Sequence, residues 1–150
     1  MTSISIVQGN WDGEDISMDD NAITKVATWY MAAWNEREVA ARHRLLEQCW
    51  SDLEQMLGGA DGIVPVTYIN SAASIKAFCG EHGGVVCTSS NAAATLKWAW
   101  ERGERILFLP DQHLGRNTAY KMGVPLDRMV VWDPNEIWAA SSPTRSRTRA

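Results

Sequence analysis

The segment that decides the fold is residues 64–123, VPVTYINSAASIKAFCGEHGGVVCTSSNAAATLKWAWERGERILFLPDQHLGRNTAYKMG. Two extended apolar runs in it end in small polar residues, YINS at 68–71 and CTSSN at 87–91, and a helix-forming run follows each of them. A strand that ends in polar residues before a helix presents backbone N–H groups to an anion. Two such tips side by side predict a small-anion site.

The rest of this half repeats the same alternation of strand and helix. Apolar, β-branched runs predict strands at 63–69, 85–87, 105–109 and 129–132, and the runs between them predict helices at 71–79, 89–102 and 113–122. This order is typical of an α/β fold, a small three-layer parallel sheet built as a Rossmann-like βαβαβαβ unit. Ligands bind beyond the carboxyl ends of such strands, so the polar tips are expected to converge on one edge.

Two helices are expected before this unit. Apolar residues recur at helical spacing from Ser17 to Trp34 and from Glu38 to Leu57, whereas residues 1–15 show no clear period, and a glycine-rich run at 58–62 ends the second helix. The predicted organisation is a helical segment of unclear origin at 1–57, an α/β domain at 63–135 and a disordered tail at 136–150.

Composition excludes several classes of protein. Hydrophobic residues make up 45% and charged residues 21%, as in ordinary globular domains, and no apolar run is long enough for a membrane span. The N-terminus has no signal-peptide pattern, so we expect a cytoplasmic protein. Residues 1–62 hold four basic and eleven acidic residues, while residues 63–150 hold ten and seven. Nothing in this pattern predicts nucleic-acid binding.

The three cysteines predict neither a disulfide framework nor a zinc site. Cys49, Cys79 and Cys87 are an odd set without CxxC spacing. Cys87 stands at a strand end before a helix, where a thiolate would be stabilised, but a buried structural cysteine is the simpler interpretation.

The polar tips offer several groups for an anion. Ser89, Ser90 and the N–H groups that open the following helix suit a carboxylate or phosphate, and Asn70 can donate to the same kind of group. Tyr68 carries a phenol that can donate to an oxyanion or relay a proton. The competing interpretation is helix capping, which serine and asparagine commonly provide.

Other polar residues are ambiguous. Asp111 is either a turn former or a functional carboxylate, and His113 either an acid–base group or a structural turn residue. His43 stands between two arginines, which favours a solvated histidine. In the same segment Trp29, Trp34 and Trp50 could line a pocket, although an aromatic stripe at helical spacing is usually core.

Four ordered motifs resemble the quinolinate synthase family. They are YINS with Lys76-Ala77, CTSSNA from Cys87, FLPD from Phe108 followed by LGR from Leu114, and Val131-Trp132. The resemblance covers about residues 51–135 and corresponds to the middle domain of that family. Residues 17–52 weakly resemble the opening helices of the polyketide-cyclase-like cone-fold family, and we assign them no function.

The resemblance implies a function in NAD biosynthesis. The family is a transferase that condenses iminoaspartate with dihydroxyacetone phosphate to quinolinate, using a [4Fe–4S] cluster held by three cysteines. Matched residue by residue, Tyr68, Ile69, Asn70 and Ser89 stand at positions that bind the substrate carboxylates, and Tyr68 could also assist proton movement. The cysteines of this chain do not stand at the cluster-ligand positions. We therefore expect this chain alone to bind no cluster.

The resemblance leaves two further hypotheses open. One is an inactive α/β module that binds a small dicarboxylate, and the other is a non-functional fragment or fusion product. Apolar surface left by missing sister domains would favour self-association.

Overall fold

The computed structural model describes residues 4–8, 20–59, 62–110 and 112–132, and its centre is one five-stranded sheet. The strands lie in the order β3-β2-β4-β1-β5. Their bounds are Ile4–Gln8 for β1, Ile63–Tyr68 for β2, Val85–Cys87 for β3, Arg105–Leu109 for β4 and Met129–Trp132 for β5. The α/β class is confirmed, and β3, β4 and β5 have the predicted bounds.

The sheet is parallel except for β1. Strand β2 pairs in parallel with β3 and β4, while β1 pairs antiparallel with both β4 and β5. The sequence predicted no strand within residues 1–15, so β1 was missed. Strand β1 has only five residues, and its neighbours β4 and β5 are distant from it in sequence. No local periodicity of apolar residues therefore indicates it.

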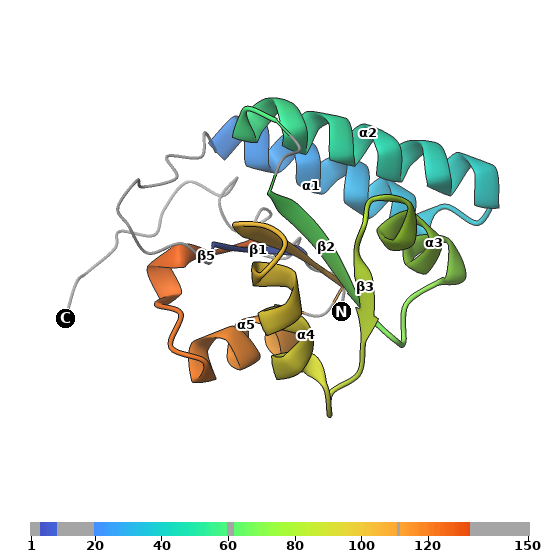
Figure 1. The fold of residues 1–150 in the computed structure, drawn as a ribbon. Helices are drawn as coiled ribbons and strands as arrows, with labels where there is room; N and C mark the ends of the chain where they lie inside the picture. Colours follow the sequence, from blue (N-terminus) through green and yellow to red (C-terminus); the bar gives the residue numbers. More distant parts are fainter. Residues whose placement is uncertain (1–3, 9–19, 60–61, 111, 133–150) are drawn as a thin grey trace, which may run out of the picture.

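The helices form a layer on each face of the sheet. They are α1 (Asp20–Asn35), α2 (Val39–Leu57), α3 (Ala73–Glu81), α4 (Ala92–Trp100) and α5 (Gln112–Lys121), with a short 3₁₀ turn at Leu126–Arg128. In Figure 1, α1, α2 and α3 cover one face of the sheet, and α4 and α5 cover the other. This arrangement is the predicted three-layer architecture. None of the helices in the described ranges combines the length and apolar character needed to cross a bilayer.

Alternation along β4 divides the core into two clusters. Leu107 and Leu109 are buried on the side of α1, α2 and α3, whereas Ile106 and Phe108 are buried on the side of α4 and α5. A strand covered on both faces is apolar along its buried length, which is why residues 106–109 read as a continuous hydrophobic run.

The α1–α2 hairpin shares the first of these clusters. Tyr30 of α1 and Leu53 of α2 are fully buried in the same cluster as Phe78 of α3. Helix α2 begins where predicted, with the Glu38 carboxylate accepting hydrogen bonds from two backbone N–H groups, and it ends at Gly58 with φ 79°. The helical pair therefore packs directly on the sheet. The domain boundary at 58–62 stays a prediction. The disordered tail at 136–150 also stays a prediction, because these residues lie outside the described ones.

Candidate functional site

The two polar tips lie side by side at the carboxyl edge of β2 and β3. Tyr68 stands opposite Cys87 in the parallel ladder, and the Ile69 N–H donates to the Cys87 carbonyl oxygen at 2.8 Å. The segments 68–71 and 87–91 are thus neighbours in space as well as similar in sequence. Both follow parallel strands and precede helices, which is where α/β sheets bind ligands.

The first tip is a tight turn that exposes Asn70. The Ser71 N–H donates to the Tyr68 carbonyl oxygen at 3.1 Å, and the Thr67 hydroxyl donates to the Ser71 hydroxyl at 2.9 Å. Ile69 is 43% exposed, and because its N–H already donates to β3, its side chain rather than its N–H is available to a ligand. Asn70 is exposed. Tyr68 is half-buried and packs on the cluster facing α4 and α5.

The second tip is held by its own side chains. The Asn91 side-chain oxygen accepts from the Thr88 N–H at 2.7 Å and from the Thr88 hydroxyl at 3.1 Å, and the Thr88 and Ser90 hydroxyls are 2.9 Å apart. Asn91 therefore stands at the N-cap position of α4 without a side-chain hydrogen bond to the first N–H groups of that helix. Ser89 is exposed beside them. This arrangement leaves N–H donors at the start of α4 for an anion.

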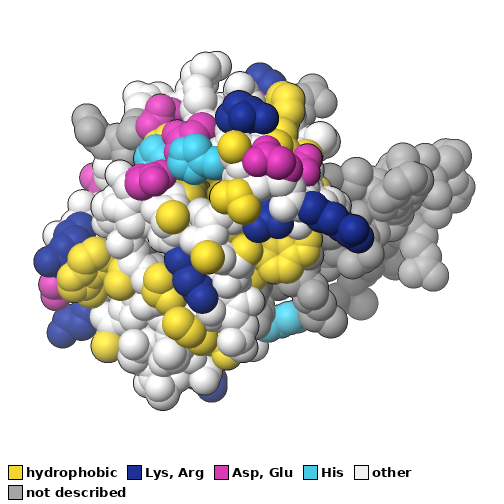
Figure 2. All heavy atoms as spheres, turned by 90° about the vertical axis from the view of Figure 1, so that its right-hand side faces the viewer, with side chains coloured by type: hydrophobic (Ala, Val, Ile, Leu, Met, Phe, Trp, Pro, Cys, Tyr) yellow, Lys and Arg dark blue, Asp and Glu magenta, His cyan; other side chains and the backbone are white. Residues whose placement is uncertain are grey.

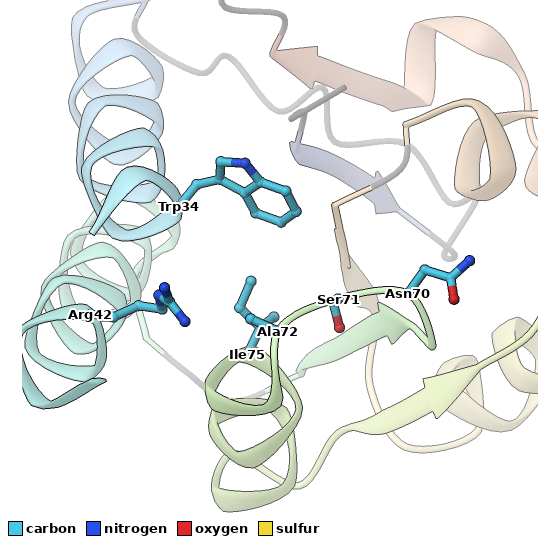
Figure 3. Close-up of a pocket in the computed structure, with 6 residues that line it drawn as sticks. All are labelled: Trp34, Arg42, Asn70, Ser71, Ala72 and Ile75. Carbon is cyan, nitrogen blue, oxygen red and sulfur yellow. The ribbon is translucent and has the colours of Figure 1, made fainter. Parts of the chain in front are cut away.

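A cavity of about 450 Å³ lies on the other side of the first tip, between α1, α2 and the β2–α3 loop. Its lining comprises Trp34, Arg42, Asn70, Ser71, Ala72 and Ile75. In Figure 3, Trp34 and Arg42 extend from α1 and α2 toward the loop, while the Asn70 side chain points away from both. Asn70 thus borders the cavity but aims its amide elsewhere.

Arg42 is the basic residue of this cavity, and sequence reasoning missed it. Its guanidinium donates to the Glu36 carbonyl oxygen through Nε and Nη2 and to the Ser74 hydroxyl through Nη1 at 3.1 Å. These bonds fix the cation between α2 and α3. The sequence held no signal for it, because Arg42 precedes Asn70 by 28 residues in a helix to which no function was assigned.

Two other sequence candidates follow β4, whose last residue Leu109 stands opposite Thr67 of β2 in the parallel ladder. His113 is exposed on α5, and Asp111 lies outside the described residues. Trp50 is buried in the core and Trp29 packs against it, as an aromatic stripe predicts, whereas Trp34 both packs on the core and lines the cavity.

The cysteines do not fit an iron–sulfur cluster. Cys49, Cys79 and Cys87 are buried thiols on α2, α3 and β3. Burial, with a smaller contribution from Asp52, raises the pKa of Cys49 to about 12, and burial with the neighbouring Cys87 raises the pKa of Cys79 to about 12. A cluster needs thiolates gathered around one point. Within the described ranges, the one group of three or more candidate metal ligands contains no cysteine.

Comparison with known proteins gives the family. Residues 28–138 match the model of the quinolinate synthetase A protein family. Curated proteins named quinolinate synthase are similar: that of Corynebacterium glutamicum is 58% identical over 91 residues, that of Rhodopirellula baltica 60% over 89, and that of Herpetosiphon aurantiacus 51% over 104. These alignments cover 61%, 59% and 68% of this chain and 23%, 22% and 28% of the relatives. No solved structure matches.

The match bears on two of the sequence-based predictions. The resemblance to quinolinate synthase is confirmed, and the family match reaches further toward the N-terminus than residue 51, taking in α2 and the second half of α1. It therefore overlaps the segment 17–52, where the sequence alone indicated a weak resemblance to cyclases. The chain spans about a quarter of the length of the curated relatives that it matches.

Proposed function

The chain belongs to the quinolinate synthetase A protein family, and on this basis we propose that it carries part of the substrate site of a quinolinate synthase. The reaction is the transferase step of NAD biosynthesis in which iminoaspartate condenses with dihydroxyacetone phosphate. Both iminoaspartate and quinolinate carry two carboxylates. The part that we assign to this chain is the binding of such a dicarboxylate at the edge formed by β2 and β3.

The pairing of the two tips is the observation that carries this proposal. The 2.8 Å bond from Ile69 to Cys87 fixes the turn that exposes Asn70 against the turn that exposes Ser89. Both turns hold their shape through bonds of neighbouring residues, such as Thr67 to Ser71 and Thr88 to Asn91. The groups left exposed at this edge are therefore oriented before a ligand arrives, which lowers the entropy lost on binding.

Each group has a distinct part in the proposal. The Asn70 amide and the Ser89 hydroxyl donate to carboxylate oxygens, and the uncapped N–H groups of α4 add the positive end of the helix dipole. Ile69 contributes an apolar contact. Tyr68, half-buried at the end of β2, is the residue that we propose to move a proton, since its phenol can donate to a developing oxyanion.

Binding without chemistry is the alternative function. It is favoured by the positions of the thiols, because Cys49, Cys79 and Cys87 are buried on α2, α3 and β3, whereas a metal cluster needs thiolates gathered around one point. An inactive dicarboxylate-binding module would use the same Asn70 and Ser89 contacts.

Two further properties belong to the proposal. A cytoplasmic location is supported by three cysteines that form no disulfide, as is usual in a reducing compartment. Self-association is supported by the exposed apolar side chains Tyr120, Met122 and Leu126, which belong to the last turn of α5 and to the residues that follow it.

Titration of the full chain with quinolinate tests the site. Amide NMR shifts are expected at Tyr68, Asn70 and Ser89 and at the start of α4. Because a hydrogen bond to a charged group contributes about 1.5–3 kcal/mol, Asn70→Ala and Ser89→Ala should each weaken binding about tenfold or more. Asn117→Ala, at an exposed position on α5, is the matched control.

Two outcomes would contradict the proposal. One is a set of shifts centred on the cavity beside Arg42 rather than on the strand edge. The other is an equal loss of affinity in the Asn117 control. Catalysis is tested separately by adding iminoaspartate and dihydroxyacetone phosphate: quinolinate formation lost in Tyr68→Phe supports the reaction, whereas binding without product supports the inactive module.

A further inference from the structure

A cluster of histidines and glutamates lies where α2 meets the end of α3, and the proposed function does not use it. The His43 Nε2 atom is 3.8 Å from the Glu47 Oε1 atom and 3.7 Å from the Glu81 Oε2 atom. One potential ligand atom from each of these three residues lies within 4.8 Å of the others. Figure 2 shows this face, with histidine side chains surrounded by acidic ones.

The geometry of the three side chains suits one metal ion. His43 and Glu47 are four residues apart in α2, so they stand on the same face of the helix. Bond lengths of about 2.0–2.2 Å place the ligand atoms of a tetrahedral zinc roughly 3.4 Å apart. The two separations from His43, 3.7 and 3.8 Å, exceed that value by a few tenths of an ångström, and all three ligand atoms lie within 4.8 Å of one another, so rotation of the side chains has to bring them closer.

His82 is an independent observation that points the same way. Its Nε2 atom is 3.0 Å from the Glu47 Oε1 atom. Its ring is held by Trp50 and Phe78, with centroid separations of 4.5 and 4.6 Å. The His82 side chain is only 20% exposed, so it is a fixed partner that orients the Glu47 carboxylate. Residues that orient ligands in this way are a regular part of protein metal sites.

The carboxylates of the cluster have only histidines as ion-pair partners in the described part of the chain. Among the residues that the structure describes, the two glutamates form ion pairs with His43 and His82 and with no lysine or arginine. Two carboxylates beside two imidazoles therefore carry negative charge when the imidazoles are neutral, and neutral imidazole is the form that binds metals. A mixed imidazole and carboxylate set favours a divalent transition metal over magnesium or calcium, which prefer oxygen ligands alone.

We propose that His43, Glu47 and Glu81 bind one divalent transition-metal ion, with His82 positioning Glu47. Three protein ligands leave further coordination positions to water. The ion would join α2 to α3 and so strengthen the attachment of the helical hairpin to the sheet. Sequence reasoning interpreted His43 as solvated, because Glu81 and His82 are more than 35 residues away and only the fold brings them near.

Zinc titration of the full chain, produced without a histidine tag and treated with a chelator, tests this site. Calorimetry should give one Zn²⁺ per chain and a higher thermal midpoint with Zn²⁺, but not with Mg²⁺. His43→Ala and Glu81→Gln should remove this binding. His82→Asn should weaken it about 10–100-fold, the usual effect of losing a residue that orients a ligand. His113→Ala, which removes an exposed histidine from α5, should bind as the parent does.

The controls decide between this site and others. Glu81 is 56% exposed, so Glu81→Gln is expected to fold, and circular dichroism checks each variant. Retained Zn²⁺ binding in both His43→Ala and Glu81→Gln overturns the proposal, as does no binding by the parent chain. Replacing Zn²⁺ with Co²⁺ identifies the ligands: absorption bands of cobalt bound to thiolate would show a cysteine site and also overturn it, whereas a spectrum without them supports it.

Discussion

The substitution Leu53→Ala tests whether the helical hairpin and the sheet form one cooperative unit. Leu53 of α2 is fully buried in the same cluster as Phe78 of α3 and Leu109 of β4. The change removes three buried carbon atoms, and at about 0.8 kcal/mol each the transfer term alone is roughly 2.4 kcal/mol. The cavity left behind adds to this value, so the free energy of unfolding should fall by about 2–5 kcal/mol.

Urea and thermal denaturation measure this loss. Far-ultraviolet circular dichroism follows the helices, and hydrogen exchange of backbone amides follows β2 and β4. For a chain of this size the thermal midpoint should fall by about 4–20 °C, with helices and strands unfolding together. Val39→Ala is the control on the same helix, because Val39 is 66% exposed and its truncation should change stability by less than about 0.5 kcal/mol.

The opposite result is also well defined. If the helical segment at residues 1–57 folded independently of the α/β domain, Leu53→Ala would unfold α1 and α2 alone. Exchange of the β2 and β4 amides would then match that of the parent chain. Either this separation or a change of less than about 1 kcal/mol would refute the shared core.

Three further predictions concern packing, capping and pH. Gly115→Ala should lower the free energy of unfolding in urea by about 1–3 kcal/mol, because the new methyl group would lie 2.6 Å from the Phe108 ring. An unchanged urea midpoint would mean that α5 does not pack on β4 as described. Glu38→Ala should lower the thermal midpoint at neutral pH, because it removes the carboxylate that caps α2. Backbone N–H groups hold the pKa of Glu38 below its usual 4.5, so its contribution to stability is present above pH 4.5 and is lost as the pH falls through the lowered pKa. The difference in thermal midpoint between parent and variant should therefore close on acidification. Burial raises the pKa of Cys49 and Cys79 from 9.0 to about 12, so the unfolded chain loses these thiol protons at a lower pH than the folded chain does. With respect to these groups, the free energy of unfolding should therefore be constant below pH 9 and fall between about pH 9 and 12. Rapid reaction of either thiol with a disulfide reagent at pH 8 without denaturant would contradict the burial.

The strands of the second half could be predicted because their signal is local. Each is a short apolar run, and β4 is bounded by Gly103 and Pro110, which interrupt regular structure. The predicted start of α4 at residue 89 was three residues early. The side chains of Thr88, Ser90 and Asn91 bond to one another in a turn, and this turn keeps the segment out of the helix until Ala92.

The neighbouring positions of the two polar tips could be predicted for a topological reason. Parallel strands present their carboxyl ends at one edge, so the alternation of strands and helices was enough to place Asn70 and Ser89 near each other. Arg42 could not be predicted, because its approach to Ser74 depends on how α2 packs over α3. Sequence spacing carries no information on the packing of helices from different parts of the chain.

The sequence by itself determined the order of strands and helices in the second half, the family and the polar edge of the sheet, since these follow from local periodicity and from short motifs. Only the tertiary structure decided the place of β1 between β4 and β5, the shared core beneath the hairpin and the meeting of His43 with Glu81. Each of these depends on contacts between residues far apart in the chain. Such contacts are selected by the burial of apolar surface and the pairing of backbone hydrogen bonds in the whole fold.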